Sequence, residues 1–465
     1  MSASLGLKGN RAVVIGINPS GIELVRYLVN QGAEVTLADA VACEKARALI
    51  DAELDVSKFN LECGDYNPKT FENATYVIVA SGIPLDLPVL ELARTSGARV
   101  VTEIEFVSLY SEVPVIAVAG TNGKSTTAHL LENMLKKAGK KVFSNVSQPM
   151  AKYLNSQEQA DHLIAVSTSF QLEGTSSFAP KMILFTNFSE DHLDKYPNIE
   201  TYFSANREVF KNATDETILI LNGLDTAVQQ MITNVPGKIL YYSSQGFPDH
   251  MAGGWVARNE MNIRRLPELD APVITFDLKN FRMRGTQNKE NALAATLAAI
   301  QLGVEPRMIQ EVLVDLRGLP HRLEFVKKLN SVAFYDDSCA SSPNATMRSL
   351  QAFNEPVIMI AGGRDKNVDY SSLIPHIRQR VKNLILVGEA KEKINRAIGD
   401  FTETFLVGTI EEAVIVAYQK SRGGDVVLLS PACSPEDQFT DHHEKGEYYR
   451  GLIEQIAMPR RANVL

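Results

Sequence analysis

A run of residues with the types and order of a phosphate-binding loop lies near residue 120 of this 465-residue chain. It follows the apolar stretch 115–119, precedes an amphipathic stretch at 128–138, and reads Gly120-Thr121-Asn122-Gly123-Lys124-Ser125-Thr126-Thr127. Between a strand and a helix, the backbone N–H groups of such a turn face an anion, the lysine reaches the outer phosphates and the serine hydroxyl binds Mg²⁺. The run predicts an ATP or GTP site. Only two residues separate its glycines, fewer than in the general motif, and Gly-Lys-Ser alone also occurs in surface turns.

Other polar runs follow apolar stretches that we expect to be strands. After the stretch 182–186 comes a run, 187–194, in which His192 lies between two aspartates. Ligands of open α/β sheets bind at the carboxyl ends of the strands, so we predict a functional role for His192, with a structural histidine as the alternative. Three further polar or small runs follow apolar stretches near the C-terminus, at 336–338, 362–366 and 430–434. Three such strand ends on one side of a sheet would line a ligand cleft.

The N-terminal part reads as a strand, a glycine turn, a helix and a second strand that ends at Asp39. This order resembles a dinucleotide fingerprint, but two of its three glycines are present and Pro19 interrupts the turn. We therefore expect a Rossmann-like sheet for another nucleotide, with an NAD-dependent enzyme as the weaker alternative. The turn at Ser81-Gly82 is a second place where backbone could approach a phosphate, although a plain strand-to-loop turn fits it equally well.

Strand-like and helical stretches alternate along most of the chain, which predicts an α/β fold. We expect three domains: a Rossmann-like domain at 1–113, a central P-loop ATPase domain with a mostly parallel sheet at 114–318, and a second Rossmann-like domain at 319–465. The stretch 224–279 does not follow this alternation and suggests β-hairpins added to the central domain.

Composition narrows the class of protein. The chain is 45% hydrophobic and 22% charged, as in globular proteins, and is too long for a single core. A net charge of −8 argues against nucleic-acid or anionic-membrane partners. No apolar run approaches the roughly 18–20 residues of a membrane span. The four cysteines lie far apart without metal-ligand spacing, and no signal peptide precedes the first apolar strand, so we expect a reducing cytoplasm.

The order of motifs along essentially the whole chain resembles the Mur ligases of peptidoglycan synthesis. The motifs are Gly120–Thr127, Ser169–Glu173, Asn187–Asp194, Asn288–Asn291, Gly318–Glu324, Asp337-Ser338, Gly362–Lys366 and Leu429–Gln438. The resemblance implies an N-terminal domain for a UDP-sugar, a central domain for ATP and a C-terminal domain for an amino acid. It also implies an ATP- and Mg²⁺-dependent ligase that adds D-glutamate, or a related amino acid, to UDP-N-acetylmuramoyl-L-alanine through an acyl phosphate. A cytoplasmic monomer is expected.

The resemblance also implies site residues by motif position. Asn145 would lie near the γ-phosphate, Lys124 on the phosphates, Ser125 on Mg²⁺, and His192 near the substrate and a second metal ion. Contacts to adenine, ribose and phosphate would come from Asn288, Asn291, Arg322 and Asp337. Contacts to the two substrates would come from Ser20, Asp39, Ser81 and Gly82 for the uridine and diphosphate, and from Ser341, Lys366 and Ser434 for the amino acid.

Several positions depart from the family pattern. A glutamate that binds Mg²⁺ is replaced by Val166, a carbamylated lysine by Asn206, and a lysine at the amino-acid subsite by Cys339; Ser147 and Pro435 also differ. Valine cannot bind a cation and asparagine is a neutral, weaker ligand. Three hypotheses therefore stay open: a ligase with slower chemistry, a divergent paralogue with another amino-acid substrate, and a noncatalytic protein that binds nucleotide or UDP-sugar.

Overall fold

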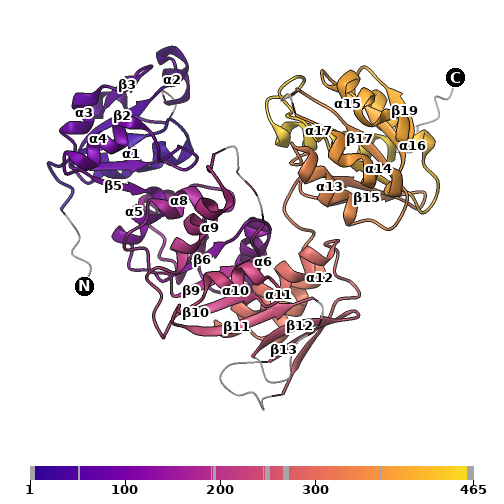
Figure 1. Ribbon diagram of the computed structural model, residues 1–465, viewed down its shortest axis with the longest axis horizontal. Coiled ribbons are helices and arrows are strands. Elements are labelled where there is room, and N and C mark those ends of the chain that lie inside the picture. The colour runs from indigo at the N-terminus through magenta and orange to yellow at the C-terminus, as the bar shows by residue number, and fades with distance from the viewer. Residues whose placement is uncertain are drawn as a thin grey trace. The chain divides into compact units, whose positions relative to one another are not determined.

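The computed structural model describes residues 6–50, 53–189, 191, 195–244, 246, 252–264, 272–365 and 368–457. The chain forms two compact units, Met1–Lys279 with Glu290–Val312 and Asn280–Lys289 with Leu313–Leu465. The first unit contains a five-stranded and a nine-stranded sheet, and the second contains a six-stranded sheet. Helices accompany each sheet (Figure 1). The three predicted α/β domains are confirmed, whereas the predicted boundaries at 113 and 318 stay predictions.

The N-terminal sheet is parallel throughout and has the strand order β3-β2-β1-β4-β5. Alternate residues of β1 face opposite cores: Val14 packs with α1, and Val13 packs with the residues of α3 and α4. Strands that are buried on both faces consist of continuous apolar runs, so these strands could be predicted from the sequence. The elements are β1 (Arg11–Ile15), α1 (Pro19–Asn30), β2 (Glu34–Asp39), α2 (Cys43–Ile50), β3 (Asn60–Cys63), α3 (Pro68–Glu72), β4 (Tyr76–Val79), α4 (Pro88–Thr95), β5 (Arg99–Thr102) and α5 (Glu103–Tyr110).

The central sheet has the order β14-β13-β12-β11-β10-β9-β6-β8-β7. It is parallel from β7 to β12, and β12, β13 and β14 pair antiparallel, which confirms the predicted hairpins. The elements are β6 (Val115–Ala119), α6 (Lys124–Lys137), β7 (Val142–Ser144), α7 (Lys152–Asn155), β8 (His162–Val166), α8 (Ser169–Glu173), β9 (Met182–Phe185), α9 (Ile199–Arg207), β10 (Ile218–Asn222), α10 (Thr226–Met231), β11 (Lys238–Ser243), β12 (Gly253–Ala257), β13 (Glu260–Arg264), β14 (Ile274–Asp277), α11 (Thr286–Gln301) and α12 (Pro306–Asp315).

The C-terminal sheet has the order β15-β16-β20-β17-β18-β19, in which only the edge strand β15 pairs antiparallel. A separate apolar core covers each face. The elements are β15 (Glu324–Leu329), β16 (Val332–Asp336), α13 (Pro343–Gln351), β17 (Val357–Ala361), α14 (Ile374–Arg380), β18 (Val381–Leu386), α15 (Lys391–Ile398), β19 (Glu403–Leu406), α16 (Ile410–Lys420), β20 (Val426–Leu429) and α17 (His442–Ala457).

Cys43 and Cys63 form a disulfide with a Cα–Cα distance of 5.1 Å. This bond does not support the reducing compartment that we expected from the spacing of the cysteines. The parallel pairing of β2 with β3 brings the two residues together, and their separation in the sequence gave no sign of it. The other two cysteines, Cys339 and Cys433, are free. Among the described helices, none has the length and apolar character that crossing a membrane requires.

Candidate active site

The predicted phosphate loop connects the end of β6 to the start of α6. Gly120 and Gly123 have φ angles of 115° and 86°, in the left-handed region that glycine adopts without steric cost. A Cβ atom on Gly120 would collide with Thr186 Oγ1 and stand 2.8 Å from Asn187 O, and one on Gly123 would collide with Asn291 Oδ1. Both the backbone conformation and close neighbours therefore require glycine at these two positions.

Asn187, just after the neighbouring strand β9, holds the loop in place. Thr121 N–H donates to Asn187 O at 2.8 Å and Asn122 N–H donates to Asn187 Oδ1 at 3.1 Å, while the Asn187 amide donates back to Asn122 O at 2.9 Å. Lys124 Nζ lies over the turn and donates to Gly120 O at 2.7 Å and Thr121 O at 2.9 Å. The ammonium group and the positive end of the α6 dipole thus lie together, as an anion site requires.

Asn291 is a distant residue that the fold brings to this loop. Thr127 Oγ1 donates to Asn291 Oδ1 at 3.3 Å, although the two residues are 164 positions apart in the sequence. Asn288, one turn earlier on α11, donates its amide to Arg284 O at 2.6 Å. The described structure therefore places Gly123 and Asn291, two of the predicted nucleotide residues, in contact.

The positions predicted to bind the metal are described only in part. Both ends of the Asn145 side-chain amide are bonded to the Val166 backbone: Oδ1 accepts from Val166 N at 2.6 Å and Nδ2 donates to Val166 O at 3.0 Å. Asn206 is 1% exposed and donates to the carbonyl oxygen four residues earlier at 2.9 Å. Ser125 lies in the first turn of α6 and is half-buried, and His192 lies outside the described residues.

A pocket of about 320 Å³ lies in the first unit. It collects three of the predicted residues, Ser20 at the start of α1, Ser81 after β4 and Asn145 after β7. Ser81 N–H donates to Ser20 Oγ at 3.3 Å, so the two predicted diphosphate residues are directly linked. Sequence reasoning missed two other residues of its wall, Glu103 and Gln148. The position of Glu103 directly after a strand can be recognised in the sequence, but its burial cannot.

Asp39 and Gly82 do not line this pocket. The Asp39 carboxylate instead accepts from Ile17 N at 2.7 Å and from Val41 N at 3.0 Å. It therefore shapes the turn after β1, next to the start of α1. Gly82 is exposed, with a φ angle of 85°.

The polar ends of β16, β17 and β20 meet in the second unit, as expected. Ser430 Oγ donates to Asp337 Oδ2 at 2.8 Å, and Arg364 N donates to Ser434 O at 2.8 Å. A pocket of about 370 Å³ has Arg364 on its wall, but its other walls are the loops after β18 and β19 and residues 437–438. The cleft therefore lies on the β18 side of these strand ends.

Three other positions bear on the predicted amino-acid subsite. Ser341 N–H donates to Cys339 O at 2.9 Å, which closes a tight turn after β16. Burial raises the pKa of the Cys339 thiol to about 11, so this side chain is neutral where the family has a lysine. Lys366 lies outside the described residues.

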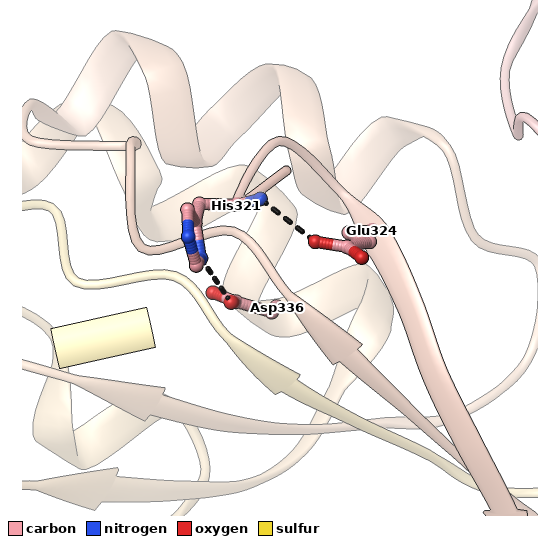
Figure 2. Close-up of side chains that lie close together, drawn as sticks. All are labelled: His321, Glu324 and Asp336. Atoms are coloured by element: carbon pink, nitrogen blue, oxygen red, sulfur yellow. Dashed lines mark hydrogen bonds and ion pairs between the residues drawn. The ribbon is translucent and has the colours of Figure 1, made fainter. Parts of the chain in front are cut away.

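Arg322 lies between two residues with left-handed backbone, His321 at φ 62° and Leu323 at φ 49°. Figure 2 shows what holds this loop: His321 Nδ1 is hydrogen-bonded to Asp336 Oδ2 at 2.7 Å, and His321 N–H donates to Glu324 Oε2 at 2.9 Å. The three side chains are close enough to bind a cation, but these hydrogen bonds already occupy them. The cluster therefore holds the loop that contains Arg322 in its conformation.

Asp337 also holds this loop. Its Oδ1 accepts from Leu323 N at 3.1 Å, so both carboxylate oxygens are occupied by protein donors. Burial raises the pKa of Asp337 to about 7. The hydrogen bond that the Asp336 carboxylate accepts from the His321 ring raises the pKa of His321 above its usual value.

Comparisons with known proteins cover the whole chain. Family models match residues 10–102 as the MurD-like N-terminal domain, 118–299 as the Mur ligase middle domain and 321–433 as the Mur ligase glutamate ligase domain. Two relatives named UDP-N-acetylmuramoylalanine–D-glutamate ligase are similar to it over their full length. That of Bdellovibrio bacteriovorus is 39% identical over 97% of this chain and 98% of its own, and that of Desulfatibacillum aliphaticivorans is 35% identical over 97% and 100%.

Solved structures share the fold at low identity. A pseudomurein peptide ligase type C from Methanothermus fervidus gives a TM-score of 0.57 at 18% identity, covering 96% of this chain and 100% of its own. The UDP-N-acetylmuramate-alanine ligase from Thermotoga maritima gives 0.58 at 16% identity, with the same coverage.

Three α/β domains with a phosphate loop at a strand end of the central one define a nucleotide-binding protein of the phosphate-loop class. The full-length similarity to relatives above 30% identity narrows this class. The chain belongs to the Mur ligase family, in its MurD-like branch.

Proposed function

We propose that this chain adds D-glutamate to UDP-N-acetylmuramoyl-L-alanine, with ATP and Mg²⁺, as a monomer in the cytoplasm, where ATP is available. The observation that carries the proposal is the position of two sites in one sheet. The phosphate loop follows β6, and Asn145, on the wall of the 320 Å³ pocket, follows β7; β8 lies between them and pairs with both. A substrate in the pocket can therefore extend its far end toward the outer phosphates of a bound nucleotide.

The chemistry needs this arrangement because a carboxylate is a poor acyl donor. Transfer of the γ-phosphoryl group of ATP to the substrate carboxylate forms an acyl phosphate and releases ADP. The amine of the incoming amino acid then attacks the acyl carbon, and phosphate leaves with the C–O bond electrons. The protein contributes positioning and positive charge, here Lys124 and the N-terminus of α6, against the charge that develops on the phosphoryl oxygens.

The residues present fit one Mg²⁺ ion better than two. The Ser125 hydroxyl is placed at the phosphate loop, where Mg²⁺ bound with the nucleotide would neutralise phosphate charge. Val166 offers an alkyl group and Asn206 a neutral amide that is bonded to its own helix, so neither fits the family's second metal position. No step of the proposed reaction is assigned to a second ion.

Phosphate release tests the proposal. The purified protein is incubated with UDP-N-acetylmuramoyl-L-alanine, ATP and Mg²⁺, and each of a panel of amino acids is added in turn. We expect release to require D-glutamate and to vanish in Lys124→Ala. Release no higher with any amino acid than without one refutes the ligase activity, and release with another amino acid alone refutes the choice of D-glutamate.

A second candidate is a protein that binds nucleotide and UDP-sugar without ligating them, or that accepts another amino acid. The replacement of metal ligands at 166 and 206, and the neutral thiol at 339, favour it. Turnover that appears only in the double variant Val166→Glu with Asn206→Lys supports the noncatalytic candidate. Robust turnover of the natural chain excludes it.

A further inference from the structure

Glu103 is a buried carboxylate to which the proposed reaction gives no role. It is the first residue of α5, it is 2% exposed, and it lies at the pocket that contains Ser20, Ser81 and Asn145. A buried carboxylate costs free energy unless hydrogen bonds compensate it, so its partners indicate its purpose. Those partners come from two separate parts of the pocket wall.

One of these residues, Ala151, belongs to the central domain, and the other, Ser20, belongs to helix α1 of the N-terminal domain. Glu103 Oε1 accepts from Ala151 N at 2.9 Å, at the end of the wall segment that contains Gln148. Ser20 and Glu103 lie on the wall of the same pocket, and the Ser20 hydroxyl acts to lower the pKa of the carboxyl group, against the effect of burial, which raises it. Ser20 Oγ accepts from Ser81 N at 3.3 Å, so its hydroxyl can still donate its proton to the Glu103 carboxylate.

We propose that Glu103 is a positioning residue for the UDP-substrate: by bonding to Ser20 and to Ala151 N–H, it fixes the two walls of the pocket relative to each other. This inference rests on the proposed function, because it identifies the pocket ligand as a nucleoside diphosphate. The carboxylate is covered and would repel a diphosphate, so it acts on the ligand through the pocket wall and not by direct contact. Helix α1, twelve residues long, presents its N-terminus beside Ser20 and favours the anion.

The same helix offers a matched control. Glu105 is 0% exposed and also joins α5 to the central domain, since its Oε1 accepts from Ser176 Oγ at 2.9 Å and from Ser177 N at 2.9 Å. It does not line the pocket. Shortening either carboxylate by one methylene group breaks a buried bridge between the same two domains, but only one of these bridges belongs to the pocket.

The test compares Glu103→Asp, Glu103→Gln and Glu105→Asp by calorimetric titration with UDP, after a thermal unfolding scan of each variant. We expect Glu103→Asp to weaken UDP binding about tenfold, because the shorter side chain cannot reach both partners. Glu103→Gln keeps the acceptor oxygen and stays within about threefold of the natural chain. Glu105→Asp binds UDP as the natural chain does, even where its melting temperature falls. Kinetics with the full substrate should show the same pattern in the KM for the UDP-substrate, with the KM for ATP unchanged.

Three results overturn the inference: unchanged UDP affinity in Glu103→Asp, an equal loss in Glu105→Asp, or a loss in Glu103→Gln as large as in Glu103→Asp. A natural chain that does not bind UDP overturns it as well. Where Glu103→Asp does not fold, Ser20→Ala removes a partner instead, and unchanged UDP affinity there has the same meaning. UDP binding that follows the expected pattern without phosphate release refutes the proposed function and leaves the positioning role in place.

Discussion

Gly123→Ala is expected to damage nucleotide binding through a residue that is far away in the sequence. The left-handed backbone costs alanine about 1 kcal/mol relative to glycine. The new Cβ would also collide with Asn291 Oδ1 and stand 3.0 Å from its Cγ, so the amide must move and lose its hydrogen bond with Thr127, which contributes about 1 kcal/mol. Together these costs lower the free energy of unfolding of the central domain by about 2 kcal/mol. Displacement of a nucleotide contact weakens ATP-analogue binding by about tenfold or more.

A control on the same helix separates the two costs. Gly139, just after the end of α6, has a φ angle of 75° and no heavy atom within 4 Å of an added Cβ. Gly139→Ala should therefore cost only the backbone contribution, about 1 kcal/mol, and leave nucleotide affinity unchanged. Stability is measured by urea unfolding, followed by the fluorescence of Trp255, which is the chain's one tryptophan and lies in the central sheet. Affinity is measured by titration with a non-hydrolysable ATP analogue. Equal affinity in the two variants would refute the argument from Asn291.

Three further predictions concern other parts of the chain. Gly446→Ala places a Cβ atom in collision with His321 Nδ1 and 2.7 Å from Asp336 Oδ2. It should therefore lower the free energy of unfolding of the second unit, measured by calorimetry, by about 2–3 kcal/mol. An unchanged melting profile contradicts this prediction. Burial raises the pKa of Asp337 from 3.8 to about 7, so the folded chain holds this proton more tightly than the unfolded chain, and the free energy of unfolding should fall as pH rises from about 4 to about 7. Asp337→Asn should flatten this pH dependence in denaturant titrations. An unchanged slope contradicts the prediction. Val166→Glu should lower the Mg²⁺ concentration for half-maximal phosphate release severalfold, whereas Val166→Gln, which adds no charge, should change it less.

The parts of the site that sequence alone could predict are those built from adjacent residues. The residues of the phosphate loop follow one another in the sequence. Its glycines, Lys124 and Ser125 therefore predict the strand, turn and helix that the structure contains. Asn291 reaches that loop only after eight more strands, and no local pattern marks its contact with Gly123. The disulfide between Cys43 and Cys63 is hidden for the same reason, because it depends on the pairing of two strands.

Asp39 and Glu103 show how little of a carboxylate's surroundings a single sequence contains, and the contact of Asp39 with uridine stays a prediction. A charged residue at a strand end reads as a ligand contact, yet the Asp39 carboxylate is occupied by two backbone N–H groups and supports a turn. Glu103 is the first residue of a helix that directly follows a strand, and the sequence does not show that this residue is buried between two domains. Burial depends on what other segments cover a side chain, and one sequence does not state that.

The altered metal positions and the intact phosphate loop have different consequences for the reaction. Nucleotide binding depends on Lys124, the loop backbone and the α6 dipole, and the structure places all three together. Val166 is the last residue of β8, which pairs with β6 next to the phosphate loop, and its backbone is bonded to the Asn145 amide. Loss of a carboxylate there removes a ligand for a cation but also removes negative charge close to the phosphates. Ground-state binding of ATP should therefore be preserved while phosphoryl transfer slows, because only the transition state loses the charge stabilisation that a second cation would supply.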